Sequence, residues 1–171
     1  MKTKTINIYS FAELSDKAKE TARDNWRQHA LDYEWYDYIY DDAQNIGLKI
    51  TEFDLDRNRH AAGKFILSAF CVAGKIIKEH GEDCETFTTA AAFLKEYNSF
   101  MGKAEKDEYG ELATYALEGA LEEIESEFLS SLLEDYSSIL QKECDWHLED
   151  DQIDDSIEAH DCEFLENGKR A

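Results

Sequence analysis

Polar residues that could bind a metal ion alternate in the segment DLDRNRH. The segment supplies carboxylate, amide and imidazole groups, which are common metal ligands, from Asp54, Asp56, Asn58 and His60. An EF-hand loop starting at Asp54 would need glycine at its sixth position and glutamate at its twelfth, where this chain has Arg59 and Phe65. The EF-hand pattern therefore fails. Two interpretations stay open: a metal-dependent enzyme using Asp54, Asp56 and His60, and a polar hairpin turn without a metal.

A second group of possible ligands has the spacing Cys-x2-His-x12-His-x-Cys. Cysteine and histidine are the ligands of structural zinc, and the long middle spacing is typical of zinc sites. The residues are Cys144, His147, His160 and Cys162. The one-residue spacing at the end is unusual, so a buried Cys144 with unrelated surface histidines is the favoured alternative. Because the sequence has no CxxC pair and no export signal, we expect its cysteines to be reduced thiols.

Established catalytic motifs are missing from the sequence. It contains no GxSxG, P-loop, GxGxxG or HExxH pattern. Asp and Glu account for 39 of the 171 residues, so no single pair of carboxylates stands out as a general acid and base. We therefore expect a protein that is not an enzyme and that carries no cofactor.

The acidic residues are concentrated and ordered near the end of the sequence. Residues 105–171 hold 22 acids and four bases, which accounts for −18 of the formal net charge of −21. In a helix, residues 150, 154 and 158 form one row and residues 151 and 155 a second, with successive members about 6 Å apart along the axis. Two such rows approach the charge density of duplex DNA, about one charge per 1.7 Å. We expect all five to face solvent as a binding surface; a solvated face that only confers solubility is the alternative.

Aromatic rings and carboxylates are mixed in DYEWYDYIYDDA, residues 32–43. At about 100° per residue, a helix through this segment turns its apolar residues inward, namely Trp35, Ile39, Ala43 and Ile46. The opposite arc carries carboxylates and two tyrosines, from Tyr33, Glu34, Asp37, Tyr40 and Asp41. Exposed tyrosine is enriched in protein interfaces. The segment therefore predicts a helix with one core face and one acidic contact face.

The first half of the sequence predicts a strand, a helix and a hairpin. TINIYS has the alternation of a short strand, and Ser10 with Glu13 fits a capping box that begins a helix with an i+4 apolar stripe from Leu14 to Ala30. Gly47 is expected to end the helix through residues 35–46. LKITEFDL and GKFILSAF then predict a hairpin, and further helices are expected to begin at Ser68 and at Thr86 or Thr88.

The longest helical pattern follows the loop GKAEKDEYG. Apolar residues recur at steps of three or four, which predicts a core stripe, at Leu117, Leu121, Ile124, Phe128, Leu132, Tyr136 and Ile139. Its outer arc should carry Glu123, Glu127 and Glu134, among Ser130 and Ser137. A short helix with Ile153 and Ile157 inward and a last strand, CEFLE, follow. We predict one α+β domain, residues 1–171, in which a small, mainly antiparallel sheet is covered by about five to six helices.

Composition and charge restrict the partners. The apolar fraction of 43% and the 21 aromatic residues are ordinary for a globular protein. No window approaches the roughly 18 uninterrupted apolar residues of a membrane span, and MKTKTINIYS lacks an apolar signal core, so we expect a cytoplasmic protein. The negative charge repels DNA, RNA and anionic lipid and attracts basic protein surfaces. We therefore expect a basic protein partner, and no direct binding of nucleic acid or membrane.

Several segments resemble a family of small acidic proteins found in bacteriophages and prophages. They are IYSFAELSDKAKETA, WYDYIYDDAQNIGLKITEFDLDRNRHAAGKF, EDYSSILQKE and ENGKR, and together they span nearly the whole chain. The resemblance implies an origin in a mobile genetic element, and it assigns no activity, cofactor or site residue. In mobile genetic elements, small, strongly acidic proteins are often inhibitors of host defence, including DNA mimics and anti-CRISPR proteins. The extension of this role to the present chain is an analogy.

These observations lead to one hypothesis and two alternatives. We expect an inhibitor that binds a host complex handling nucleic acid, such as a CRISPR effector or a restriction enzyme, through a surface that imitates DNA. The alternatives are the metal-dependent enzyme described above and an antitoxin-like partner of a basic toxin. The expected contact residues are Tyr33, Glu34, Asp37, Tyr40, Asp41, Glu123, Glu127, Asp150, Asp151, Asp154, Asp155 and Glu158.

Overall fold

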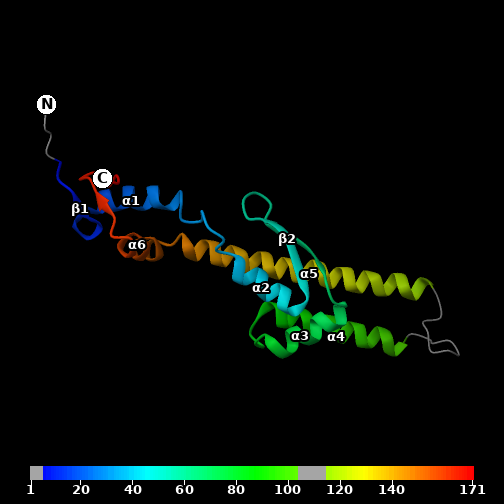
Figure 1. The fold of residues 1–171 in the computed structure, drawn as a ribbon. Helices are drawn as coiled ribbons and strands as arrows, with labels where there is room; N and C mark the ends of the chain where they lie inside the picture. The colour runs from blue at the N-terminus through cyan, green and yellow to red at the C-terminus, as the bar shows by residue number, and fades with distance from the viewer. Residues whose placement is uncertain (1–5, 104–114) are drawn as a thin grey trace. The chain divides into compact units, whose positions relative to one another are not determined.

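The computed structural model describes residues 6–103 and 115–171, which form helices and two small sheets and confirm the α+β class. Strand β1 (Tyr9–Ser10) pairs antiparallel with β4 (Glu163–Phe164), and β2 (Leu48–Asp54) pairs antiparallel with β3 (His60–Phe65). These are two separate sheets, where the sequence predicted one. The chain is built from two compact units. We call the residues up to Trp35 together with Lys142–Ala171 the terminal unit, and Tyr36–Gln141 the central unit (Figure 1).

In the terminal unit, helix α1 (Asp16–Arg27) packs against helix α6 (Asp150–Ala159) beside the β1–β4 pair. The facing sides of the two helices are apolar at helical spacing. Their buried side chains are Ala18 and Ala22 on α1 and Ile153 and Ile157 on α6. Phe11 and Phe164 extend this core, with ring centroids 6.1 Å apart. The predicted inward position of Ile153 and Ile157 and the predicted C-terminal strand are confirmed.

The start of α1 differs from the prediction. Ser10 and Glu13 do make contact, because the backbone N–H and the hydroxyl of Ser10 each donate to Glu13 Oε2 at 2.8 Å. This contact caps a short 3-10 helix, η1 (Phe11–Glu13), and α1 begins after it with Ser15 as N-cap. The two helices are separate because the intervening Leu14 is extended and turns its side chain into the core.

The C-terminal segment folds back onto α1. Beyond β4, Arg170 forms an antiparallel bridge with Phe164. Gly168, in the turn between them, has φ = 81°, and a Cβ at this position would overlap the carbonyl oxygen of Ala18. Glycine is required here both by the left-handed backbone and by the close approach to α1. This turn fixes the position of Lys169 and Arg170 beside α1.

The central unit is built around the part of α5 (Tyr115–His147) that precedes residue 142. Beside it lie the β2–β3 hairpin and three helices, α2 (Asp37–Ile46), α3 (Ala69–Glu79) and α4 (Glu85–Lys103) (Figure 1). Phe128 of α5 lies against both α4 and β3. Its ring stacks on Phe93 of α4 with centroids 4.2 Å apart, and Phe65 of β3 lies 5.4 Å away. The other fully buried side chains include Ile39, Ile46, Leu48, Val72, Ile76, Leu132, Tyr136 and Leu140.

Two predicted boundaries in the central unit are confirmed. Gly47 follows α2 with φ = 97°, the left-handed conformation of a helix C-cap. The hydroxyl of Ser68 accepts a hydrogen bond from the backbone N–H of Cys71 at 3.3 Å and caps α3. The fourth helix begins at Glu85, so that Thr86 lies inside its first turn and is buried.

The predicted stripe of α5 is buried in its middle and less so at its ends. Phe128, Leu132 and Tyr136 are in the core, whereas Leu121, Ile124 and Ile139 are half-buried and the side chain of Leu117 lies outside the described residues. Ser137 was expected on the surface and is only 1% exposed. The reason is that, around Ser137, neighbouring elements cover more of the circumference of α5 than its apolar stripe alone.

Gly168→Ala tests whether the C-terminal segment is docked on α1. A left-handed φ costs an alanine about 1–2 kcal/mol, and overlap with the α1 backbone adds to this cost. We expect the free energy of unfolding to fall by more than about 2 kcal/mol, measured by urea denaturation followed by circular dichroism.

Gly74→Ala is the matched control for this substitution. Gly74 lies within α3, and a Cβ there has no atom within 4 Å, so alanine should stabilise the helix by about 0.5–1 kcal/mol. A Gly168→Ala protein as stable as the parent would contradict the docked segment.

Candidate acidic interface

Two arginines of α1 hold two of the α6 carboxylates, Asp150 and Asp154. Arg23 donates to both oxygens of Asp154, with Nε to Oδ1 at 2.6 Å and Nη2 to Oδ2 at 2.5 Å. The hydrogen bond with Asp154 raises the pKa of the Arg23 guanidinium above its ordinary value. Arg27 pairs with Asp150 and donates from Nε to the carbonyl oxygen of Leu148 at 3.1 Å. Arg23 and Arg27 thus neutralise the side of α6 that faces α1.

The prediction that the whole set of α6 acids faces solvent is therefore wrong for Asp154. The Asp154 side chain is only 25% exposed, and Asp150, although 58% exposed, is paired with both arginines. The cause is the packing of Ile153 and Ile157 on α1, which turns Asp150 and Asp154 toward the arginines.

The second row of α6 does face solvent. Asp151 and Asp155 are exposed, and so is Glu158, which the sequence pattern placed in the first row; the three fall within about 60° of one another on the helix. Within the described part of the chain, no residue forms an ion pair with them. These three carboxylates form what we call the α6 row, and they remain available to a partner.

A larger group of carboxylates lies on the first half of α5. The chain has no Lys or Arg between residues 107 and 141. Five glutamates lie within ten residues of α5, and all are exposed except the half-buried Glu125: Glu118, Glu122, Glu123, Glu125 and Glu127. Over nine rises of about 1.5 Å their mean axial spacing is about 3.4 Å, which equals the phosphate spacing along one DNA strand. We call these five residues the α5 cluster; the predicted outward positions of Glu123 and Glu127 are confirmed.

The predicted contact face of residues 33–41 does not form on a single helix. The helix α2 begins only at Asp37, so Tyr33 and Glu34 belong to the terminal unit and the later residues to the central unit. Glu34, Asp37 and Asp41 are exposed, as expected. Tyr33 is 55% exposed and its hydroxyl lies 3.3 Å from His147 Nδ1.

Tyr40 is less available than expected. Its ring is half-buried and lies 5.1 Å from the Tyr36 ring and 6.2 Å from the Phe53 ring, centroid to centroid. Burial raises the pKa of its hydroxyl above the ordinary value. The segment before α2 also departs from the helical prediction, since Trp35 is buried without being helical and its ring contacts His147. The β2–β3 hairpin covers Tyr40, which the local helical pattern could not indicate.

The two candidate metal sites gain no support from the structure. Residues 6–103 and 115–171 contain no group of three or more His, Cys, Asp or Glu arranged to hold a metal ion. In the hairpin, Asp54 Oδ1 accepts from the backbone N–H of Asp56 at 2.8 Å, and His60 Nδ1 donates to the carbonyl oxygen of Asn58 at 2.9 Å. These side chains hold a polar turn, which favours the simpler interpretation.

The four Cys and His candidates each have other surroundings. Cys162 is buried in the terminal core, and His160 donates from Nδ1 to the carbonyl oxygen of Ser156 at 2.7 Å. His147 Nε2 lies 3.3 Å from Glu143 Oε1, and Cys144 is half-buried. Their sequence spacing therefore reflects helix and core positions.

The structure brings together a polar group that the sequence did not indicate. The hydroxyl of Tyr136, which is fully buried, donates to Asp42 Oδ2 at 2.7 Å. Asp42 Oδ1 lies 3.6 Å from His80 Nε2, and His80 Nδ1 lies 2.8 Å from Thr86 Oγ1. His80 and then the Tyr136 hydroxyl hold the pKa of Asp42 below its ordinary value, against the opposing effect of burial.

This polar group stabilises the central unit and is not arranged for catalysis. A hydroxyl, an imidazole and a carboxylate occur in the order used by many hydrolases. The Thr86 residue is only 2% exposed, however, so a substrate has no access to its hydroxyl. Helices α2, α3, α4 and α5 each contribute or adjoin one member, and the group therefore ties the helices together. In the sequence, this polar group was indicated only by polar side chains next to predicted core positions.

Comparison of the chain with protein-family models, curated proteins and solved structures finds no match. None of the helices in the described part of the chain is both long and apolar enough to span a lipid bilayer.

Asp154→Asn and Asp155→Asn distinguish the two rows of α6. The first leaves the poorly exposed Arg23 guanidinium without its bidentate partner, and we expect it to lower the free energy of unfolding by about 1–3 kcal/mol. The second removes only repulsion between exposed charges and should change stability by less than about 0.5 kcal/mol. Urea denaturation of both proteins measures the difference; equal effects would show that the arginines do not distinguish the rows.

Asp42→Ala and Tyr136→Phe test the polar group. Asp42→Ala leaves a buried hydroxyl without an acceptor and should cost about 1–3 kcal/mol at pH 7, whereas Tyr136→Phe leaves a carboxylate that water can reach and should cost about 1 kcal/mol. Because the native pKa of Asp42 is lowered, its stabilisation is present above the ordinary carboxyl pKa and is lost as pH falls through the native value. The difference between the parent and Asp42→Ala should therefore shrink in urea titrations at pH 3; a constant difference would contradict this account.

Proposed function

We propose that this protein is a non-enzymatic inhibitor from a bacteriophage or prophage that binds a host complex handling nucleic acid. Its carboxylates would occupy a basic groove that normally accepts the phosphate backbone. A CRISPR effector or a restriction enzyme has such a groove. The protein would act in the cytoplasm of the host cell and would bind neither nucleic acid nor membrane itself.

The observation that carries this proposal is the α5 cluster. Exposed like charges at i, i+4, such as Glu118 with Glu122 and Glu123 with Glu127, destabilise a helix by a few tenths of a kcal/mol per pair. Solubility requires a net charge of only about 2–8 in magnitude for a small domain, far less than −21. A contact that rewards dense negative charge accounts for the excess, because complementary charge speeds encounter and selects basic partners.

The α6 row adds three carboxylates in the terminal unit, and Glu34, Asp37 and Asp41 add exposed charge near the start of α2. Asp150 and Asp154 are not included, because Arg23 and Arg27 already neutralise them. Tyr33 is exposed and would contact a partner, whereas Tyr40 is largely engaged with the hairpin.

The test is a triple substitution in the α5 cluster. Glu122→Gln, Glu123→Gln and Glu127→Gln together remove three exposed charges without removing a described ion pair. The parent protein, used to capture partners from host lysate, should retain a nucleic-acid-handling complex that DNA or RNA displaces and that high salt releases. The triple variant should bind the identified partner about tenfold or more weakly, through a lower association rate.

A second triple variant with the same change in charge is the control. Glu79→Gln, Glu82→Gln and Asp83→Asn alter exposed residues of the same unit outside the cluster and should preserve binding. An equal loss of partner binding in both triple variants would show that binding depends on net charge and not on the α5 cluster. Capture that is insensitive to salt, with nucleic acid still bound to the partner, would overturn the DNA-mimic mechanism, and capture of a lone basic toxin would favour the antitoxin-like alternative.

A further inference from the structure

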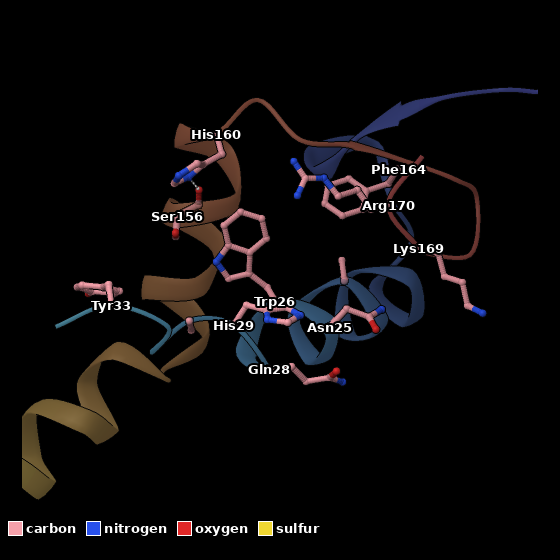
Figure 2. A pocket seen from close by; sticks show the side chains of 13 residues that line it. Asn25, Trp26, Gln28, His29, Tyr33, Ser156, His160, Phe164, Lys169 and Arg170 are labelled. Atoms are coloured by element: carbon pink, nitrogen blue, oxygen red, sulfur yellow. Dashed lines mark hydrogen bonds between the residues drawn. The ribbon is translucent and has the colours of Figure 1, made fainter. Parts of the chain in front are cut away.

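A cavity of about 720 Å³ opens on the terminal unit between α1, α6 and the C-terminal segment (Figure 2). This volume lies in the range of about 300–1,000 Å³ typical of small-molecule sites. In Figure 2 the indole of Trp26 stands in the middle of the lining, with His160 on one side and Phe164 and Arg170 on the other. The cavity is thus formed by segments from both ends of the sequence.

Among the residues that the structure describes, those lining this cavity include no carboxylate. Thirteen residues line it and none is Asp or Glu, although 39 of the 171 residues of the chain are acidic. It does contain two of the 18 Lys and Arg residues, Lys169 and Arg170, and two of the five histidines. The cavity lining is therefore positively charged, whereas the chain as a whole is negatively charged.

The two cations are available to a ligand. Lys169 and Arg170 are exposed, and no described carboxylate pairs with either of them. Their position is set by the Gly168 turn against α1 and by the bridge of Arg170 to Phe164. A guanidinium on a positioned backbone can bind a carboxylate or a phosphate through two parallel hydrogen bonds.

The aromatic part of the lining offers a flat apolar surface. Trp26 is half-buried, and the His160 ring meets it edge-on with centroids 5.3 Å apart. His160 Nδ1 donates to the Ser156 carbonyl oxygen, so the orientation of the imidazole is fixed. No described residue accepts a hydrogen bond from the Trp26 indole N–H. A planar ring could lie against Trp26 with the indole N–H still available as a donor.

We propose that this cavity binds a small aromatic anion, with its ring against Trp26 and its phosphate or carboxylate on Arg170 and Lys169. The two possible sources of this chemistry are a nucleoside monophosphate and an aromatic carboxylate. A cationic ligand would be repelled by Lys169 and Arg170, and a neutral ring would leave both cations unused. The site is separate from the α5 cluster and does not depend on the function proposed above.

The experiment follows the indole N–H of Trp26 by two-dimensional NMR, assigned by its loss in Trp26→Phe. The probes are adenosine monophosphate and 1-naphthoate, with adenosine, naphthalene-1-methanol and inorganic phosphate as their uncharged or ring-free counterparts. We expect at least one aromatic anion to shift the Trp26 signal at sub-millimolar concentration, and its counterparts to bind about tenfold or more weakly. The stronger of the two anions identifies the source. The signals of Trp35 and Trp146, which do not line the cavity, are internal references.

Substitutions then test the roles of the cations. The double change Lys169→Gln and Arg170→Gln should weaken binding about tenfold or more, whereas Lys17→Gln, an exposed lysine of α1 outside the cavity, should leave it unchanged. The parent pattern of NMR signals in the double variant confirms that the fold is kept. The proposal is overturned if neither anion shifts Trp26 at millimolar concentration, if a counterpart binds as tightly, or if the double variant binds like the parent.

Discussion

The pairing of Arg23 and Arg27 with the α6 carboxylates is the interaction on which the terminal unit depends. The ten residues of α6 include five acids and no base, and a helix this short is marginal in water even without repulsion. Burial of Ile153 and Ile157 on α1 brings the acids close to the arginines, and the arginines in turn remove the repulsion that would oppose the burial. Asp150 and Asp151 also lie in the first turn, where the helix dipole favours negative charge. Apolar packing and charge neutralisation therefore act together on one face of α6.

The same constraint decides which carboxylates are free. An acid that faces a base within the fold forms an ion pair that stabilises the fold, as Asp154 does. An acid on the opposite face stays unpaired and can interact with solvent or with a partner. In α5 the long segment without any base leaves the cluster with no ion pair to a described residue, and the core contacts of Phe128, Leu132 and Tyr136 must outweigh its repulsion. The central unit can tolerate this because α5 is long and contacts β3, α4 and α2, whereas α6 packs mainly on α1 and η1.

Patterns within one segment were sufficient for much of the fold. The periodicity of Ile153 and Ile157, the glycine after α2 and the serine before α3 each act over a few residues, and each is confirmed. The errors arise where a distant segment decides the outcome. The partner of Asp154 is 131 residues away in the sequence, the hairpin that covers Tyr40 follows it in the chain, and the acceptor for the buried Tyr136 hydroxyl is 94 residues away. The cavity beside Trp26 was also missed, since its lining comes from both ends of the chain and no single segment has an unusual pattern.

Charge segregation explains how an acidic protein could offer both an acidic surface and a site for an anion. At physiological ionic strength, exposed charges beyond about 8 Å are largely screened, so the contacts inside a cavity outweigh the carboxylates elsewhere on the molecule. The net charge would slow the approach of an anion, while Arg170, Lys169 and the Trp26 ring would set how long it stays. For a basic macromolecule the balance reverses, because a large partner meets many carboxylates at once and the summed attraction speeds its association. One charge distribution would therefore separate the two proposed classes of ligand by size as well as by sign.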